Sequence, residues 1–185
     1  LETLAQAHAE ATRDDAFWAQ YDHALAARGA RPTPLVALPR LIASLGGATL
    51  WLKREDLCEG GSFCSSLALY MASLAKRMGR AGLVTESATG DFGVALGAAG
   101  AWLGLHVRVY MSREDLQREP AQARWMQRLG VELISVDAPG RGRRGACAEA
   151  MRHWLGCHHD TLYVTSMLAS PDPYPTIIAR AVRVI

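Results

Sequence analysis

Lysine is nearly absent from this sequence. Of its 20 basic residues, only Lys53 and Lys76 are lysines, and the others are arginines. Chemistry that needs an imine between a protein amine and a carbonyl compound must therefore use one of these two amines. Neither sign of charge dominates, because the formal net charge is only +2. This value is too small to indicate binding to nucleic acid or to a membrane surface, and we expect neither partner.

Cysteines are few, and long hydrophobic runs are missing. The four cysteines in 185 residues do not make a disulfide scaffold, so we expect a reducing compartment, the cytoplasm. No apolar segment reaches the length of a membrane span, and no signal-peptide pattern opens the sequence. Hydrophobic residues nevertheless make up 50% of the chain, which is enough to bury the core of a domain.

Helical and strand patterns alternate along the whole chain. Such alternation is typical of an α/β fold, a parallel sheet with flanking helices joined by right-handed crossovers. The last helical pattern stops at Ile185 without a capping residue, so we expect residues 1–185 to be a single truncated domain. Helices are expected at residues 2–29, 39–47, 65–79, 92–104, 119–130, 146–156 and from 176, and strands at 48–53, 82–86, 106–111, 131–136 and 161–166.

The stretch TESATGDFG, residues 85–93, combines a carboxylate with a turn at the end of a strand. Glu86 closes a strand that is predicted to be buried, at the carboxyl edge where open α/β sheets bind ligands. The turn after it leads into a helix whose free N–H groups can hold an anion such as a carboxylate. An ordinary strand-to-helix turn with a solvated Glu86 fits the spacing equally well.

Two other stretches are interpreted as surface features. GRGRRG at residues 140–145 matches a dinucleotide-binding pattern, but no acidic residue ends the next strand, so a mobile basic loop is the better interpretation. Its arginines remain available for an acidic partner or an anion. CHHD at residues 157–160 holds potential metal ligands, yet consecutive side chains point in different directions. We expect a solvated turn there rather than a metal site.

The sequence resembles the N-terminal half of the tryptophan synthase β subunit over nearly its whole length. The matching stretches include RPTPL, LKREDL, AKRMG, VYMSREDLQRE, RLGVELISV and PDPYPTII, in this order. The resemblance implies the fold-type II architecture of pyridoxal-phosphate enzymes, with a mobile subdomain at about residues 78–165. It also implies a protein partner, either an α-subunit-like protein or a second copy in a homodimer.

The same resemblance assigns roles to residues near the predicted strand end. It implies that Glu86 is the catalytic glutamate, which positions indole and handles protons at its ring. It implies that the turn after Glu86 grips the carboxylate of an amino-acid substrate. The residues of this carboxylate site are Ser87, Ala88, Thr89, Gly90, Asp91 and Phe92.

The sequence departs from this family where the family binds its cofactor. The lysine that carries pyridoxal phosphate is replaced by Cys64, the histidine before it by Phe63, and the asparagine that supports the pyridine ring by Ser66. Asp91 adds a negative charge where a substrate carboxylate is expected. We therefore expect no bound pyridoxal phosphate and no metal. Cys64 is a candidate catalytic residue by its position, although a small, partly buried side chain is the default expectation for it.

Three functions remain open on the sequence. The favoured one is a repurposed enzyme that acts on an indole-like, tryptophan-like or amino-acid substrate without pyridoxal phosphate, with Glu86 as acid and base. The second is a non-catalytic binding or regulatory subunit that pairs with a tryptophan synthase α-like or other protein, which the segment VYMSREDLQRE motivates. The third is a fragment of a degenerate pyridoxal-phosphate lyase.

Overall fold

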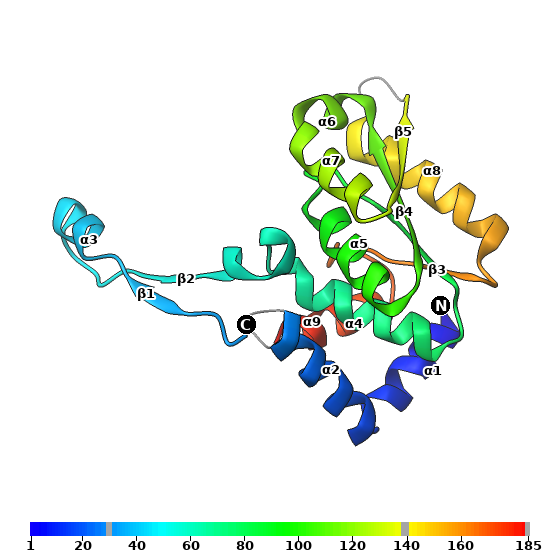
Figure 1. Ribbon diagram of the computed structural model, residues 1–185, viewed down its shortest axis with the longest axis horizontal. Helices are drawn as coiled ribbons and strands as arrows, with labels where there is room; N and C mark the ends of the chain where they lie inside the picture. The colour runs from blue at the N-terminus through cyan, green and yellow to red at the C-terminus, as the bar shows by residue number, and fades with distance from the viewer. Residues whose placement is uncertain (29–30, 138–140, 184–185) are drawn as a thin grey trace.

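The computed structural model describes residues 1–28, 31–137 and 141–183. Its centre is a parallel sheet with the strand order β5-β4-β3-β6 (Figure 1). The strands are β3 (Gly82–Glu86), β4 (His106–Ser112), β5 (Glu132–Val136) and β6 (Thr161–Tyr163). The predicted α/β fold, a parallel sheet with flanking helices, is therefore confirmed.

Helices cover both faces of this sheet. On one face, α5 (Asp91–Leu103) packs closely enough for its glycines to lie against Val107 and Val109 of β4. On the other face, α8 (Gly142–Cys157) places the rings of His153 and Trp154 beside Tyr110 and Tyr163. Two more helices pack on α5: α4 (Cys64–Arg77), and α7 (Pro120–Arg128), which also contacts β5. Three further helices pack on α4, namely α1 (Glu2–Ala11), α2 (Asp15–Arg28) and α9 (Tyr174–Val182).

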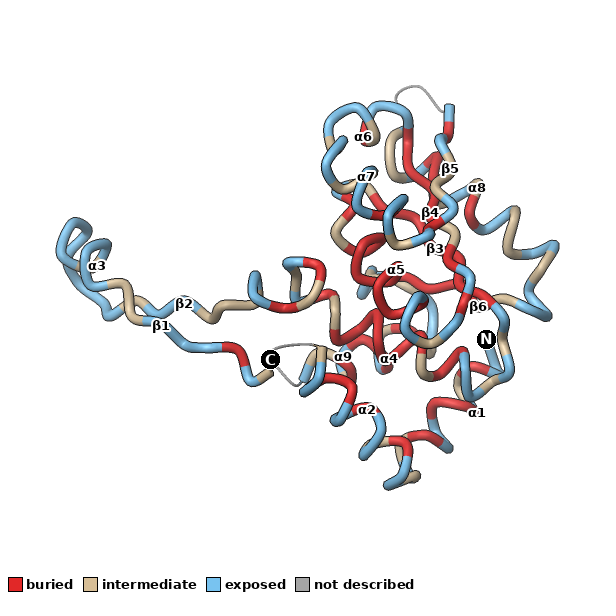
Figure 2. Tube along the Cα trace, viewed as in Figure 1, coloured by how far each residue is buried: buried red, intermediate tan, exposed pale blue. Residues whose placement is uncertain are grey.

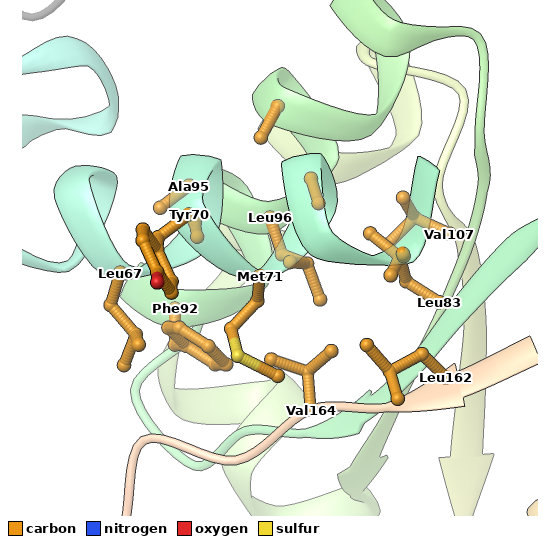
Figure 3. Packing of buried hydrophobic residues seen from close by; sticks show 14 of the residues in the cluster. Leu67, Tyr70, Met71, Leu83, Phe92, Ala95, Leu96, Val107, Leu162 and Val164 are labelled. Atoms are coloured by element: carbon orange, nitrogen blue, oxygen red, sulfur yellow. The ribbon is translucent and has the colours of Figure 1, made fainter. Parts of the chain in front are cut away.

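Apolar side chains of α4, α5 and the sheet form the core (Figure 3). Met71 of α4, Leu96 of α5 and Leu83 of β3 are at most 1% exposed. Every residue of β3 is buried, as is typical of a parallel strand that helices cover on both faces. The core therefore fixes the end of β3, where Glu86 lies.

The first two strands do not belong to this sheet. β1 (Leu35–Ala37) and β2 (Trp51–Lys53) pair with each other in antiparallel fashion, and α3 (Pro39–Leu45) joins them. Together they form an arm that extends from the body and is largely exposed (Figures 1 and 2). The expectation that the strand at residues 48–53 joins the parallel sheet is therefore wrong. The chain reverses after α3 at Gly46 and Gly47, whose positive φ angles suit glycine, and this brings β2 back along β1.

Two helices at the start of the chain differ from the prediction. The helix expected over residues 2–29 is two helices, α1 and α2. The carboxylate of Asp14 accepts hydrogen bonds from the N–H groups of Ala16 and Phe17, and it thereby starts the second helix. α4 begins one residue before the predicted start, at Cys64. Two short 3₁₀ segments, η1 (Glu55–Leu57) and η2 (Glu59–Gly61), lead into it.

The predicted basic loop is also partly wrong. α8 begins at Gly142, so Arg143 and Arg144 lie in its first turn rather than in a loop, while Gly140 lies outside the described residues.

One helix, α6 (Arg113–Arg118), is absent from the sequence prediction. Its N-terminus is capped by Ser112, whose Oγ accepts a hydrogen bond from the N–H of Asp115 at 3.1 Å.

The region predicted as a mobile subdomain, residues 78–165, contains all four parallel strands and α5 to α8. Its mobility stays a prediction. In the part of the chain that the structure describes, no helix is both long enough and apolar enough to cross a membrane.

Candidate functional site

The candidate site is centred on Glu86, at the carboxyl edge of the sheet. The Glu86 side chain has no exposed surface, so the alternative of a solvated glutamate is wrong. The hydroxyl of Tyr163, at the end of the neighbouring strand β6, donates a hydrogen bond to Oε2 at 2.5 Å. Nη2 of Arg143, from the first turn of α8, donates to Oε1 at 3.2 Å and forms an ion pair. Both carboxylate oxygens therefore have a partner.

Tyr163 is held in place from two further directions. The backbone oxygen of Tyr163 accepts a hydrogen bond from the hydroxyl of Tyr174 at 2.6 Å. The sulfur of Cys147 lies 3.5 Å from the hydroxyl of Tyr163. Burial and the nearby charge of Glu86 raise the pKa of Tyr163. The phenol therefore stays protonated and acts as a donor to Glu86. Tyr163 was not predicted as a partner of Glu86, although it lies within the strand predicted at residues 161–166.

Arg143 is the solvent-facing partner of Glu86. Its side chain is 39% exposed, whereas that of Glu86 is fully covered. The Nε atom of Arg143 is buried, and it has no hydrogen-bond partner among the described residues. This role was not predicted, because residues 140–145 were expected to form a surface loop. The first turn of α8 instead brings the guanidinium to the strand end.

The turn after β3 uses part of its own hydrogen-bonding capacity. The N–H of Ser87 donates to the backbone oxygen of Tyr110 at 3.0 Å, and the N–H of Gly90 donates to Oγ of Ser87 at 3.0 Å. Gly90 has a φ of +82°, and a Cβ atom there would lie 2.5 Å from Cβ of Gln122. Glycine is therefore required at this position. Two of the N–H groups in the predicted carboxylate site are already occupied.

The other residues of the predicted carboxylate site are spread between surface and core. Thr89 is exposed and Ala88 is half-buried, whereas Phe92 is 4% exposed and packs in the core. Asp91 opens α5, and its Oδ1 accepts a hydrogen bond from Nε2 of Gln122 at 2.8 Å. The turn thus presents a carboxylate of its own.

Cys64 is the first residue of α4, and it is 8% exposed. Burial raises the pKa of its thiol and the charge of Asp91 raises it too, although a hydrogen bond with Ser62 opposes both effects. A thiol with a raised pKa is a weak nucleophile, because the thiolate is the reactive form. Cys64 agrees with the expectation of a small, buried side chain.

Neither lysine lies at the start of α4. Nζ of Lys53 donates to the backbone oxygen of Thr33 at 2.8 Å, at the base of the arm. Lys76 is exposed in the last turn of α4, about 18 Å along the helix axis from Cys64. Ser66 is fully buried, and its Oγ accepts a hydrogen bond from Nε of Arg31 at 3.0 Å.

Metal ligands do not gather in the described part of the chain. No group of three or more histidine, cysteine, aspartate or glutamate side chains that could hold a metal ion occurs there. His158, His159 and Asp160 form an exposed turn after α8, as expected for the sequence CHHD.

Comparison with solved structures shows the same fold in two enzymes. The chain matches diaminopropionate ammonia lyase of Escherichia coli in its apo form with a TM-score of 0.65 and 21% identity, over 82% of this chain and 45% of that one. It matches a pyridoxal 5'-phosphate-dependent aspartate racemase with a TM-score of 0.58 and 22% identity, over 73% of this chain and 40% of that one. The chain thus spans less than half the length of either enzyme.

Comparison with protein families gives a match over most of the chain. The family described as "Pyridoxal-phosphate dependent enzyme" matches residues 26–174. This range includes the arm, the start of α4 and all four parallel strands. The chain belongs to the family of pyridoxal-phosphate dependent enzymes.

Proposed function

We propose that this chain binds a small amino-acid or indole-like ligand beside Glu86 and moves a proton on it without imine-bound pyridoxal phosphate. The observation that carries the proposal is the buried carboxylate of Glu86 at the carboxyl edge of the sheet. The strand order reverses beside β3, because β6 follows β5 in the chain but pairs with β3. Such reversals are where open α/β sheets bind their ligands.

The residues present do not fit an imine-bound cofactor. A Schiff base needs an amine at the site, and Cys64 stands where the resemblance to tryptophan synthase β places the lysine. The amine of Lys53 is bound at the base of the arm, and Lys76 lies at the far end of α4. Ser66, at the position that would support the pyridine ring, already bonds to Arg31. The proposed chemistry therefore uses protein side chains alone.

Tyr163 and Arg143 contact different oxygens of Glu86 and have different roles. Tyr163 holds Oε2, so the carboxylate keeps one orientation, and Oε1 faces Arg143. A ligand N–H or ammonium group that replaces Nη2 of Arg143 meets Oε1 as its acceptor. From this position Glu86 takes up a proton as a base and returns it as an acid. Cys64 has no nucleophilic role in this scheme, because its raised pKa keeps the thiol protonated.

Proton transfer is tested with Glu86→Gln, which keeps the shape of the side chain and removes the charge. Exchange of deuterium into indole, tryptophan or serine, followed by NMR, should fall roughly a hundredfold or more. Glu10→Gln, at an exposed position of α1, is the control and should leave the rate unchanged. Equal exchange rates in Glu86→Gln and the parent, with the same circular dichroism, would refute the assignment.

Cofactor loss has its own test. Protein mixed with pyridoxal phosphate should show no visible aldimine absorbance, and borohydride should leave both lysines unmodified in mass spectra. A stable yellow species that borohydride reduces onto Lys53 or Lys76 would contradict the proposal.

A second candidate, a binding or regulatory subunit, is favoured by the surface of α6 and α7. Trp125 is 44% exposed there, and the ion pair of Arg113 with Asp137 at 3.0 Å is solvent-exposed. Asp115 is 2% exposed, so it does not belong to this surface. In this case Arg113→Glu with Glu114→Arg should abolish a complex with a tryptophan synthase α-like protein, or a homodimer, in light scattering. Glu86→Gln should then leave ligand affinity unchanged.

A further inference from the structure

We infer that Arg143 determines the specificity of this site by binding the carboxylate of a zwitterionic amino acid whose ammonium group binds Glu86. The inference rests on the proposed function and narrows its ligand, because it favours amino acids over neutral indoles. On binding, the single ion pair between Glu86 and Arg143 is exchanged for two ion pairs with the ligand.

The pair is asymmetric in a way that allows this exchange. Glu86 is fully covered and anchored through Oε2 by Tyr163, whereas Arg143 is 39% exposed. Their contact, from Nη2 to Oε1, is 3.2 Å long. Arg143 is therefore the member that can turn outward when a ligand reaches Oε1.

Arg143 also has a donor, Nε, that no described residue uses. A guanidinium carries five N–H donors, and the Nε of Arg143 is buried without a hydrogen-bond partner among the described residues. A buried donor without a partner costs free energy. A ligand carboxylate can accept from Nε and a terminal nitrogen together, which is the favoured geometry of arginine–carboxylate pairs.

Charge matching selects against neutral ligands. A neutral indole that displaced Arg143 would leave the buried charge of Glu86 without a counter-ion, which is strongly unfavourable. An ammonium group keeps that charge paired. The unpaired charge thus acts as a repulsive element that rejects the wrong ligand.

The turn after β3 is a poor alternative carboxylate site. The N–H groups of Ser87 and Gly90 are already used, and Asp91 adds a negative charge there. The first turn of α8 contains no acidic residue, so the surroundings of Arg143 on its own helix favour an anion. The ligand carboxylate is therefore placed at Arg143 rather than at residues 87–92.

The test is calorimetry with four probes that share one ring: tryptophan, tryptamine, indole-3-propionate and indole. The wild-type protein should bind tryptophan at least tenfold more tightly than each of the other three. Removing either charged group from the probe should weaken binding, because each group has its own partner in the protein.

Variants of Arg143 separate its role from that of Glu86. In Arg143→Gln, tryptophan and tryptamine should bind with equal affinity. Arg143→Lys keeps the positive charge beside Glu86 and so protects the fold. Its affinity for tryptophan should still fall several-fold, because an ammonium group cannot form a bidentate contact with a carboxylate. Arg144→Gln, one residue along the same turn, is the matched control and should bind all four probes as the wild type does.

The outcomes distinguish this inference from the proposed function. If the wild type binds tryptophan and tryptamine equally, or if Arg143→Lys keeps full tryptophan affinity, the role of Arg143 is wrong while the site at Glu86 stands. If Glu86→Gln binds every probe as the wild type does, or if the wild type binds none, the proposed function and this inference fail together.

Discussion

The hydroxyl of Tyr163 lies 2.5 Å from Oε2 of Glu86 and joins the ends of two neighbouring parallel strands. Tyr174 extends the connection, because its hydroxyl donates to the backbone oxygen of Tyr163. A buried carboxylate is thus tied to β6 and to the start of α9. The contact serves the stability of the fold and the orientation of Glu86 at the same time.

Tyr163→Phe removes one hydroxyl and leaves Oε2 of Glu86 buried without its donor. We expect the free energy of unfolding to fall by about 1–3 kcal/mol, as for other buried acceptors that lose their partner. Urea denaturation measures this change. In a double-mutant cycle with Glu86→Ala, which removes the acceptor, Tyr163→Phe should cost much less than in the parent, because the two side chains form one hydrogen bond. Additive losses would show that the contact does not couple them.

Cys64→Ala tests whether the thiol only fills space. The variant should lose about 1 kcal/mol of stability, the cost of a small cavity, and it should keep any ligand binding. The thiol of Cys64 should also react with iodoacetamide more slowly than those of Cys147 and Cys157, which are only half-buried. Loss of all turnover with the fold intact would instead make Cys64 a nucleophile.

The buried His8 predicts a dependence of stability on pH. Burial lowers the pKa of His8 below its ordinary value of 6.5, and Arg180 lowers it further. Above that value both the folded and the unfolded chain carry a neutral His8, so it contributes no pH dependence. As the pH falls through 6.5, the unfolded chain takes up a proton that the folded protein resists, and the free energy of unfolding decreases.

Urea denaturation at pH values above and below this range measures the effect. In His8→Gln the loss of stability on acidification should be smaller than in the parent, though not zero. Burial and Arg108 also lower the pKa of His153, which acts in the same direction. An unchanged loss would mean that His8 is not coupled to folding.

Two glycines in helices should respond to alanine with opposite signs. A Cβ atom at Gly97 of α5 would lie 2.5 Å from Cγ2 of Val131, so Gly97→Ala should destabilise the protein by about 1 kcal/mol or more. A Cβ atom at Gly156 of α8 would meet no atom within 4 Å. Gly156→Ala should therefore stabilise the protein by about 0.5–1 kcal/mol through helix propensity. Thermal unfolding of both variants checks the pair.

Local patterns in the sequence were enough to place β3, its final Glu86 and the helix that starts near Cys64. These features depend on residues close together in the chain, where hydrophobic spacing and turn residues decide the structure. The partners of Glu86 could not be predicted in this way, because they are distant from it in the sequence. Tyr163 is 77 residues away in sequence and Arg143 is 57 residues away, and both contacts depend on which strand lies beside β3 and on where α8 begins.

The arm is a second case in which the sequence predicted a local element but not its partner. The sequence at residues 48–53 predicts a strand correctly in type, since Trp51 to Lys53 form β2. Its partner and direction follow from a reversal of the chain at Gly46 and Gly47. Alternating elements therefore indicated one parallel sheet, whereas the described residues form two separate sheets.

The glycines of α5 also determine when this helix can form. Gly93, Gly97 and Gly100 let the helix approach β4 and its neighbours, but each lowers the intrinsic helix propensity by about 1 kcal/mol relative to alanine. α5 is therefore unstable on its own and gains its stability from surfaces that come later in the chain. We therefore expect this helix to form only together with β4 and α7, and φ-values measured for residues of α5 should be low.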